Sequence, residues 1–162
     1  MRSKHTFRVL VLLLCLVQLE SYAQKQKTLC RLVILDARIE GQDVTEYYVD
    51  RKQFLTLYQT ANGEVYFANV SSSTDEQSFG RTYNTTWDKG KETDSTFPYV
   101  KCDFKWSYLN SYDKKRGTGT VSLLVIKKPQ GNMFVCTIIL ENLEQVVYKG
   151  YVEGTLDLSS VR

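Results

Sequence analysis

Four pairs of acidic residues lie close enough in the sequence to be candidates for paired-carboxylate chemistry, in which two carboxylates at one site act as acid and base. Each pair falls near a segment in which we expect a loop or turn, where a solvated carboxylate is the ordinary state. The pairs are Asp36 with Glu40, Asp43 with Glu46, Asp75 with Glu76, and Glu92 with Asp94. We therefore expect these acids to be surface residues rather than catalysts.

The single histidine, His5, lies in an N-terminal segment that we interpret below as a signal peptide. Without it, the remaining chain has no Ser-His-Asp or Cys-His arrangement. It also has no imidazole ligand for zinc, copper or iron. We predict that the protein is not an enzyme and that it has no cofactor and no metal site.

Three cysteines, Cys30, Cys102 and Cys136, lie outside the N-terminal segment. Their wide spacing is unlike that of a zinc or iron–sulfur site, and the odd count allows either one disulfide or three buried thiols. We expect hairpin turns at 114–117 and 129–131. These turns would place Cys102 and Cys136 two strands apart and about four residues out of register. A disulfide needs Cα atoms within about 7 Å, so we predict that these two are not bonded to each other.

The aromatic residues of 99–112 are the candidates for a binding site. Phe104, Trp106, Tyr108 and Tyr112 share one parity, while most of the alternate positions are polar, which predicts a half-buried antiparallel strand. The four side chains could line a ligand cavity, because Trp and Tyr combine large apolar faces with a polar edge. The alternative is that they form the core of the domain.

Two further motifs carry less weight. The basic triplet at 114–116 lies at an expected hairpin tip, where charged residues keep a turn solvated, and no second basic cluster accompanies it. We therefore expect no nucleic-acid partner. The segments 69–71 and 84–86 match the Asn-x-Ser/Thr glycosylation pattern, which is common by chance.

Strand patterns account for almost the whole chain after the N-terminal segment, and no segment has a convincing helical period. The Asn62-Gly63 pair, between two apolar runs, predicts a hairpin with a type I′ turn, in which both central residues have positive φ. We expect strands at 28–39, 44–49, 53–60, 64–71, 78–87, 99–112, 118–128, 132–140 and 145–158.

Short connections between successive strands predict an all-β fold of antiparallel neighbours. We expect an up-and-down barrel of about eight strands, of the calycin kind, with a two-sheet β-sandwich as the alternative. The likeness to calycins rests on strand count alone. The Gly-x-Trp that lipocalins carry in their first strand is missing from 28–39, so no function follows from the likeness.

The first 23 residues have the pattern of a cleaved signal peptide. Basic residues come first, an apolar run at 9–17 follows, and small residues stand at Ser21 and Ala23. The run is shorter than the about 20 residues that span a bilayer, so we expect no membrane-spanning segment. We predict cleavage after Ala23, a single β domain at 24–162, and a secreted or periplasmic location.

These patterns lead to a hypothesis of an exported, non-enzymatic binding protein. In its specific form, a small apolar or amphipathic ligand is held in the interior of a β-barrel, against Phe104, Trp106, Tyr108 and Tyr112. The alternative is a protein–protein or cell-envelope interaction module with no small ligand. A concave pocket lined by Trp106 would favour the ligand, and a filled core with an exposed aromatic patch would favour the partner.

Overall fold

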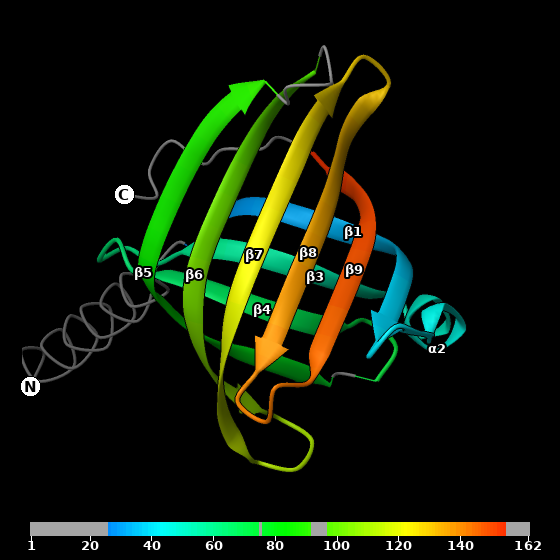
Figure 1. Cartoon of the computed structure of the whole chain (residues 1–162). Coiled ribbons are helices and arrows are strands. Elements are labelled where there is room, and N and C mark those ends of the chain that lie inside the picture. The colour runs from blue at the N-terminus through cyan, green and yellow to red at the C-terminus, as the bar shows by residue number, and fades with distance from the viewer. Residues whose placement is uncertain (1–25, 75, 92–96, 155–162) are drawn as a thin grey trace, which may run out of the picture.

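The computed structural model of the chain describes residues 26–74, 76–91 and 97–154. In this part, the strands form one antiparallel sheet that closes into a barrel, because β1 pairs with both β3 and β9 (Figure 1). The elements are β1 (Lys27–Ile39), β2 (Gln42–Asp43), α2 (Thr45–Asp50), β3 (Gln53–Gln59), β4 (Val65–Ser71), β5 (Gln77–Lys91), β6 (Pro98–Asn110), β7 (Arg116–Lys128), β8 (Gly131–Leu140) and β9 (Gln145–Glu153). The expected eight-stranded up-and-down barrel is confirmed, with β2 as one extra strand beside β1.

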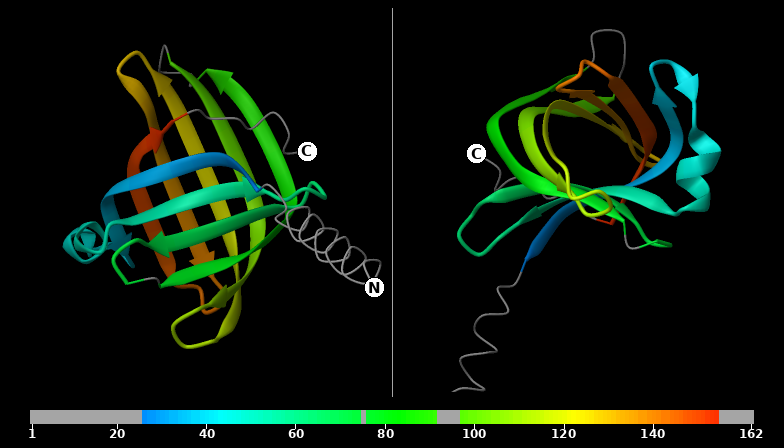
Figure 2. Two further views of the ribbon diagram at one scale, coloured as in Figure 1. Left: turned by 180° about the vertical axis from the view of Figure 1, so that it is seen from behind. Right: turned by 90° about the horizontal axis from the view of Figure 1, so that it is seen from below.

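The barrel consists of two crossing arrays of strands. In Figure 1, β6 to β9 stand upright in front of β1, β3 and β4, and Figure 2 shows the closed ring from below with α2 at its side. Gly80 on β5 and Gly150 on β9 lie where neighbouring backbones come unusually close. A Cβ at Gly80 would lie 1.7 Å from the Ser107 carbonyl oxygen, and one at Gly150 would lie 1.8 Å from that of Val33. Closure of the barrel therefore depends on glycine at both positions.

The interior is filled by the inward-facing side chains of all eight barrel strands. On β6 the alternation is the expected one, with Cys102, Phe104 and Trp106 buried and the residues between them half-buried or exposed. Phe67 on β4 and Phe134 on β8 are among the largest fully buried side chains. The apolar core thus lies inside the barrel, as the period-two pattern requires.

The segment 44–49, which we expected to be a strand, is mostly helical. Helix α2 covers Thr45–Asp50, and Val44 and Tyr48 both pack against the core from positions four residues apart. A spacing of four places two side chains on one face of a helix. An Asp43 carboxylate oxygen also accepts a hydrogen bond from the Thr45 N–H at 2.9 Å, which turns the chain into the helix.

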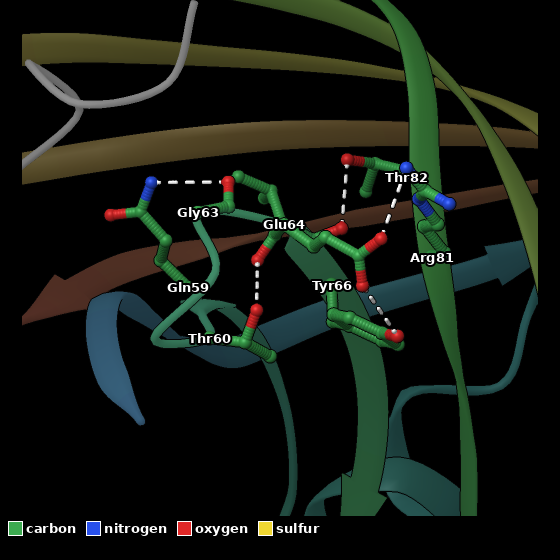
Figure 3. Close-up of polar contacts among 8 residues, drawn as sticks. Gln59, Thr60, Gly63, Glu64, Tyr66, Arg81 and Thr82 are labelled. Carbon is green, nitrogen blue, oxygen red and sulfur yellow. Dashed lines mark hydrogen bonds and ion pairs between the residues drawn. The ribbon is translucent and has the colours of Figure 1, made fainter. Parts of the chain in front are cut away.

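The hairpin between β3 and β4 is confirmed, but its turn is of a different type. Only Gly63 has positive φ (83°), and its N–H bonds to the Thr60 carbonyl, as in a type I turn followed by a glycine bulge. Glu64 ties the hairpin to the next strand, since one carboxylate oxygen lies 3.1 Å from the Arg81 guanidinium and the other accepts from the Tyr66 hydroxyl at 3.3 Å (Figure 3).

The turn between β6 and β7 lies at 111–115. It begins three residues before the expected turn at 114–117. As a result, Leu109 pairs with Arg116, and Cys102 pairs with Leu123 rather than with Lys128 or Pro129. Lys114 takes the left-handed conformation that the turn needs, with φ of 58°. Within the described ranges, no helix is long and apolar enough to cross a membrane.

Candidate functional site

The predicted binding residues do not gather in one cavity. Phe104 and Trp106 point into the barrel and are 2% and 3% exposed. Trp106 packs edge to face against Phe67, with 5.0 Å between ring centroids, and its Nε1 donates to the Phe67 carbonyl at 3.0 Å. Tyr108 is half-buried, with its ring 4.4 Å from that of Trp106. Packed side chains therefore occupy this part of the interior.

Tyr112 occupies a different place from the other three. Because β6 ends at Asn110, Tyr112 lies in the β6–β7 loop and is 77% exposed. Our expectation that it shares the inward face of the strand is therefore wrong. It lines instead a hollow at one end of the barrel, which we call the mouth pocket.

The mouth pocket lies where α2, the β4–β5 loop and the β6–β7 loop meet. Its volume is about 400 Å³, within the range of about 300–1,000 Å³ that is typical of ligand sites. Hydroxyl and amide groups dominate its lining. The lining residues are Tyr47, Tyr48, Arg51, Gln53, Asn69, Glu76, Gln77, Ser78, Asn110 and Tyr112.

Sheet register assembles one wall of the mouth pocket. Asn69, Ser78 and Asn110 are direct neighbours across β4, β5 and β6. Asn69 and Asn110 take the inward parity that Phe67 and Trp106 hold deeper in the barrel. Neighbouring strands lie about 4.8 Å apart, so the three polar side chains form one continuous row. The inward face thus changes from apolar to polar at this end of the barrel.

Helix α2 and the residue that follows it supply the other wall. The Arg51 guanidinium lies over the Tyr47 ring at 3.7 Å from its centroid. The Tyr48 ring contacts that of Tyr148 edge to face, with 5.2 Å between centroids. Because Tyr48 packs against the core, it fixes the position of the helix beside the pocket.

Tyr148 connects the two walls from below. Its hydroxyl accepts a hydrogen bond from Asn69 Nδ2 at 3.2 Å and is also hydrogen-bonded to the Tyr48 hydroxyl. Burial raises the pKa of both tyrosines, that of Tyr148 most strongly. Both hydroxyls therefore remain neutral hydrogen-bonding groups near neutral pH.

Three buried polar atoms around the mouth pocket have no hydrogen-bond partner among the residues that the structure describes. They are Arg51 Nε, Gln53 Oε1 and Asn69 Oδ1. An unpaired buried polar atom costs about 1–3 kcal/mol, so three at one hollow are a strong reason to expect a ligand or bound solvent there.

A second hollow, of about 920 Å³, adjoins the first along α2. Tyr47 and Tyr48 line both hollows, so the two rings form a shared wall. The second hollow also has Ile39, Val44 and Val49 in its lining and is more apolar than the mouth pocket. One face of this wall is therefore suited to polar groups and the other to apolar groups.

The sequence patterns did not single out Arg51, Gln53 or Tyr48, and they marked Asn69 only as a match to the glycosylation pattern. Gln53 and Asn69 carried a usable signal, because each takes the parity of inward apolar residues on its own strand. A polar residue at an inward position near a strand end is a candidate for the mouth of a barrel. Arg51 and Tyr48 gave no such signal, because their position depends on α2.

Two of the acidic residues have local partners where the structure describes them. Asp36 lies 3.6 Å from the Arg38 guanidinium, as an ion pair on β1. A hydrogen bond from the Thr45 backbone lowers the pKa of Asp43. Asp75, Glu92 and Asp94 lie outside the described residues, as does the predicted signal peptide at 1–23.

The three thiols are free and buried, which confirms that Cys102 and Cys136 are not bonded to each other. The predicted offset of four residues is wrong, because both pair with Leu123 in register and lie two strands apart. Burial raises the pKa of Cys30 and Cys102 to about 12 and that of Cys136 further. Thiols in this state are poor nucleophiles. No cluster of metal-ligating side chains occurs within the described ranges.

Comparison with known proteins gives no relative from which to carry over a role. No protein-family model, no curated protein sequence and no solved structure matches the chain. The geometry of the barrel and its mouth is therefore the basis for inferring a function.

Proposed function

We propose that the chain is a non-enzymatic binding protein whose small, amphipathic ligand occupies the mouth pocket. The observation that carries the proposal is that three residues of one hollow, Arg51, Gln53 and Asn69, each have a buried polar atom without a partner among the described residues. In this proposal the ligand lies at the end of the barrel rather than deep in its interior, where Trp106 and Phe104 are packed. Of the four residues predicted from the sequence, Tyr112 belongs to the proposed site.

The amphipathic character follows from the shared wall of Tyr47 and Tyr48. The polar part of a ligand would meet the amide and hydroxyl groups of the mouth pocket. An attached apolar part would lie across the tyrosines towards Val44 and Val49. Such a site combines apolar surface with a few placed polar groups, as small-molecule sites generally do.

We also propose that the protein is exported, to the periplasm or outside the cell. The support is the succession of basic, apolar and small residues in 1–23. N-terminal sequencing of protein from its own source tests this, and a mature chain that begins at Gln24 is expected. A retained Met1 would contradict it.

A screen of small molecules by thermal shift, followed by NMR mapping of the hits, tests the binding site. We expect shifts at Tyr48, Asn69 and Tyr112 and loss of binding in Arg51→Ala. Arg81→Ala is the matched control, because Arg81 is an exposed arginine on the outer face of β5. Hits that map to the barrel interior, or that bind Arg51→Ala unchanged, would contradict the proposed site.

A protein-interaction module is the second candidate, and one observation favours it. The outer face of β1, β3, β4 and β5 has a hollow of about 450 Å³ lined in part by Phe54, Tyr58 and Phe79. The Arg31 guanidinium lies over the Phe54 ring at 3.9 Å. Aromatic and arginine side chains are enriched at protein interfaces. Loss of a partner in Phe79→Ala, but not in Arg51→Ala, would support this candidate.

A further inference from the structure

We infer that the polar part of the ligand in the mouth pocket is a saccharide. The inference rests on the proposed function and assigns the chemical class of its ligand. It is carried by the mixture of donors and acceptors around the hollow, by the balance of charge in its lining, and by the tyrosine faces at its rim.

The unpartnered atoms require a ligand that both donates and accepts hydrogen bonds. Arg51 Nε is a donor, whereas Gln53 Oε1 and Asn69 Oδ1 are acceptors. Asn69 Nδ2 donates to the Tyr148 hydroxyl at 3.2 Å, and its Oδ1 has no partner among the described residues. A carboxylate could accept from Arg51 but would leave both amide oxygens unpaired. Hydroxyl groups satisfy all three atoms, because each hydroxyl both donates and accepts.

The chain of hydrogen bonds beneath the pocket adds one more donor. Tyr148 accepts from Asn69 and can give its own hydroxyl proton to Tyr48. Tyr48 also lines the pocket, and its hydroxyl can donate as well as accept. The polar floor therefore offers donors and acceptors side by side, as a vicinal pair of sugar hydroxyls requires.

Charge and shape agree with a neutral sugar. Arg51 and Glu76 are the charged residues among the described lining, and their signs are opposite, so an ion of neither sign is favoured by net charge. Tyr112, with its exposed ring, and Tyr47 stand at the rim. Tyrosine rings offer apolar faces with little entropy to lose, on which the C–H face of a sugar ring can stack. A hollow of about 400 Å³ suits the end of a short glycan.

The test is binding of the purified chain to a glycan array, with hits confirmed by calorimetry with the free sugar. The probes are neutral mono- and disaccharides, with glucuronic acid, acetate and inorganic phosphate as anionic comparisons. We expect at least one neutral saccharide to bind and to bind at least tenfold more tightly than each anion.

Two pairs of variants locate the binding. Gln53→Leu removes one unpartnered acceptor and should weaken the saccharide at least tenfold, whereas Gln59→Leu, at the other end of the same strand, should not. Tyr112→Ala removes an exposed ring and should weaken binding, whereas Tyr83→Ala, an exposed tyrosine of β5 that is not in the pocket lining, should leave it unchanged.

The outcomes separate the two proposals. If an anion or another small molecule binds at the mouth pocket and no saccharide does, the inferred ligand class is contradicted, whereas the proposed location of the binding site is supported. Saccharide binding that is unaffected by Gln53→Leu and Tyr112→Ala also overturns the inference. Absence of any ligand at the pocket, from the array and from the thermal-shift screen alike, overturns both.

Discussion

The Asn69 amide donates to the Tyr148 hydroxyl at 3.2 Å, although the two residues are 79 positions apart in the sequence. Asn69 lies on β4 and Tyr148 on β9, so the bond joins strands that are not neighbours in the sheet. It supports the proposed site from beneath. A single hydrogen bond thus connects the stability of the barrel to the chemistry of its mouth.

Tyr148→Phe should reduce the free energy of unfolding by about 1–3 kcal/mol, because it leaves the buried Asn69 amide without its acceptor. Urea unfolding measures this. Tyr151→Phe is the control, since Tyr151 is 40% exposed, and it should change stability by less than about 0.5 kcal/mol. Equal effects of the two substitutions would show that the buried bond contributes little.

Trp106→Ala should reduce the free energy of unfolding by about 3–5 kcal/mol, the usual cost of removing a large buried aromatic side chain. The residue is 3% exposed and is hydrogen-bonded to the Phe67 carbonyl. Tyr112→Ala, which removes an exposed ring, should cost less than about 0.5 kcal/mol. A loss below about 1 kcal/mol for Trp106→Ala in denaturant melts would argue against a packed interior.

Gly80→Ala and Gly150→Ala should each destabilise the barrel by about 3 kcal/mol or more, at or above the usual cost of overpacking. In both cases the new Cβ would lie within 2 Å of a neighbouring backbone oxygen. Gly119→Ala is a matched control within β7, because its Cβ would meet the Ile139 carbonyl oxygen at 3.2 Å. Thermal unfolding of the three variants gives the comparison. If Gly80→Ala and Gly119→Ala have the same melting temperature, the close approach of the backbones at Gly80 does not limit closure of the barrel.

Stability should fall as the pH rises above about 9. Burial raises the pKa of Cys30 and Cys102 from 9.0 to about 12, so the unfolded chain loses these protons first and is favoured between the two values. Each thiol contributes a slope of up to about 1.4 kcal/mol per pH unit in that window. Urea melts at pH 8 and pH 10 measure the difference. Cys102→Ala should reduce the slope, and an unchanged slope would mean that other groups cause it.

The thiols should also be unreactive until the chain unfolds. All three are buried and held in the protonated form, so a thiol reagent at pH 8 should label them only in denaturant. Mass spectrometry before and after addition of urea counts the labels. Rapid labelling of the native protein would show that the barrel opens readily.

The positions and order of the barrel strands could be predicted from the local sequence pattern. On β6, the alternation of Cys102, Phe104 and Trp106 with polar residues determines which face is buried, because side chains on a strand alternate with period two. Asn62-Gly63 marked a hairpin, because glycine tolerates the positive φ that a tight turn needs. These signals depend on a few neighbouring residues and not on the rest of the chain.

Register and α2 could not be predicted in the same way. A shift of the β6–β7 turn by three residues was enough to place Cys102 opposite Leu123 instead of Lys128. The reason is that moving a turn changes the cross-strand partner of every residue in the hairpin. The segment after Asp43 has an apolar spacing that suits a short helix as well as a strand. Packing of Val44 and Tyr48 on the barrel decided between the two.

By itself, the sequence determined an all-β fold of antiparallel strands and the aromatic, apolar face of 99–108, because these follow from local periodicity; the choice of a closed barrel over a sandwich came from the pairing of β1 with β9. Only the tertiary structure decided where a ligand could bind. Asn69, Ser78 and Asn110 are brought into one row by the pairing of β4, β5 and β6, and α2 is held beside them by the contact of Tyr48 with Tyr148 on β9. The physical reason is that a site built from such distant segments depends on register and closure, which arise when the whole sheet pairs and its core packs.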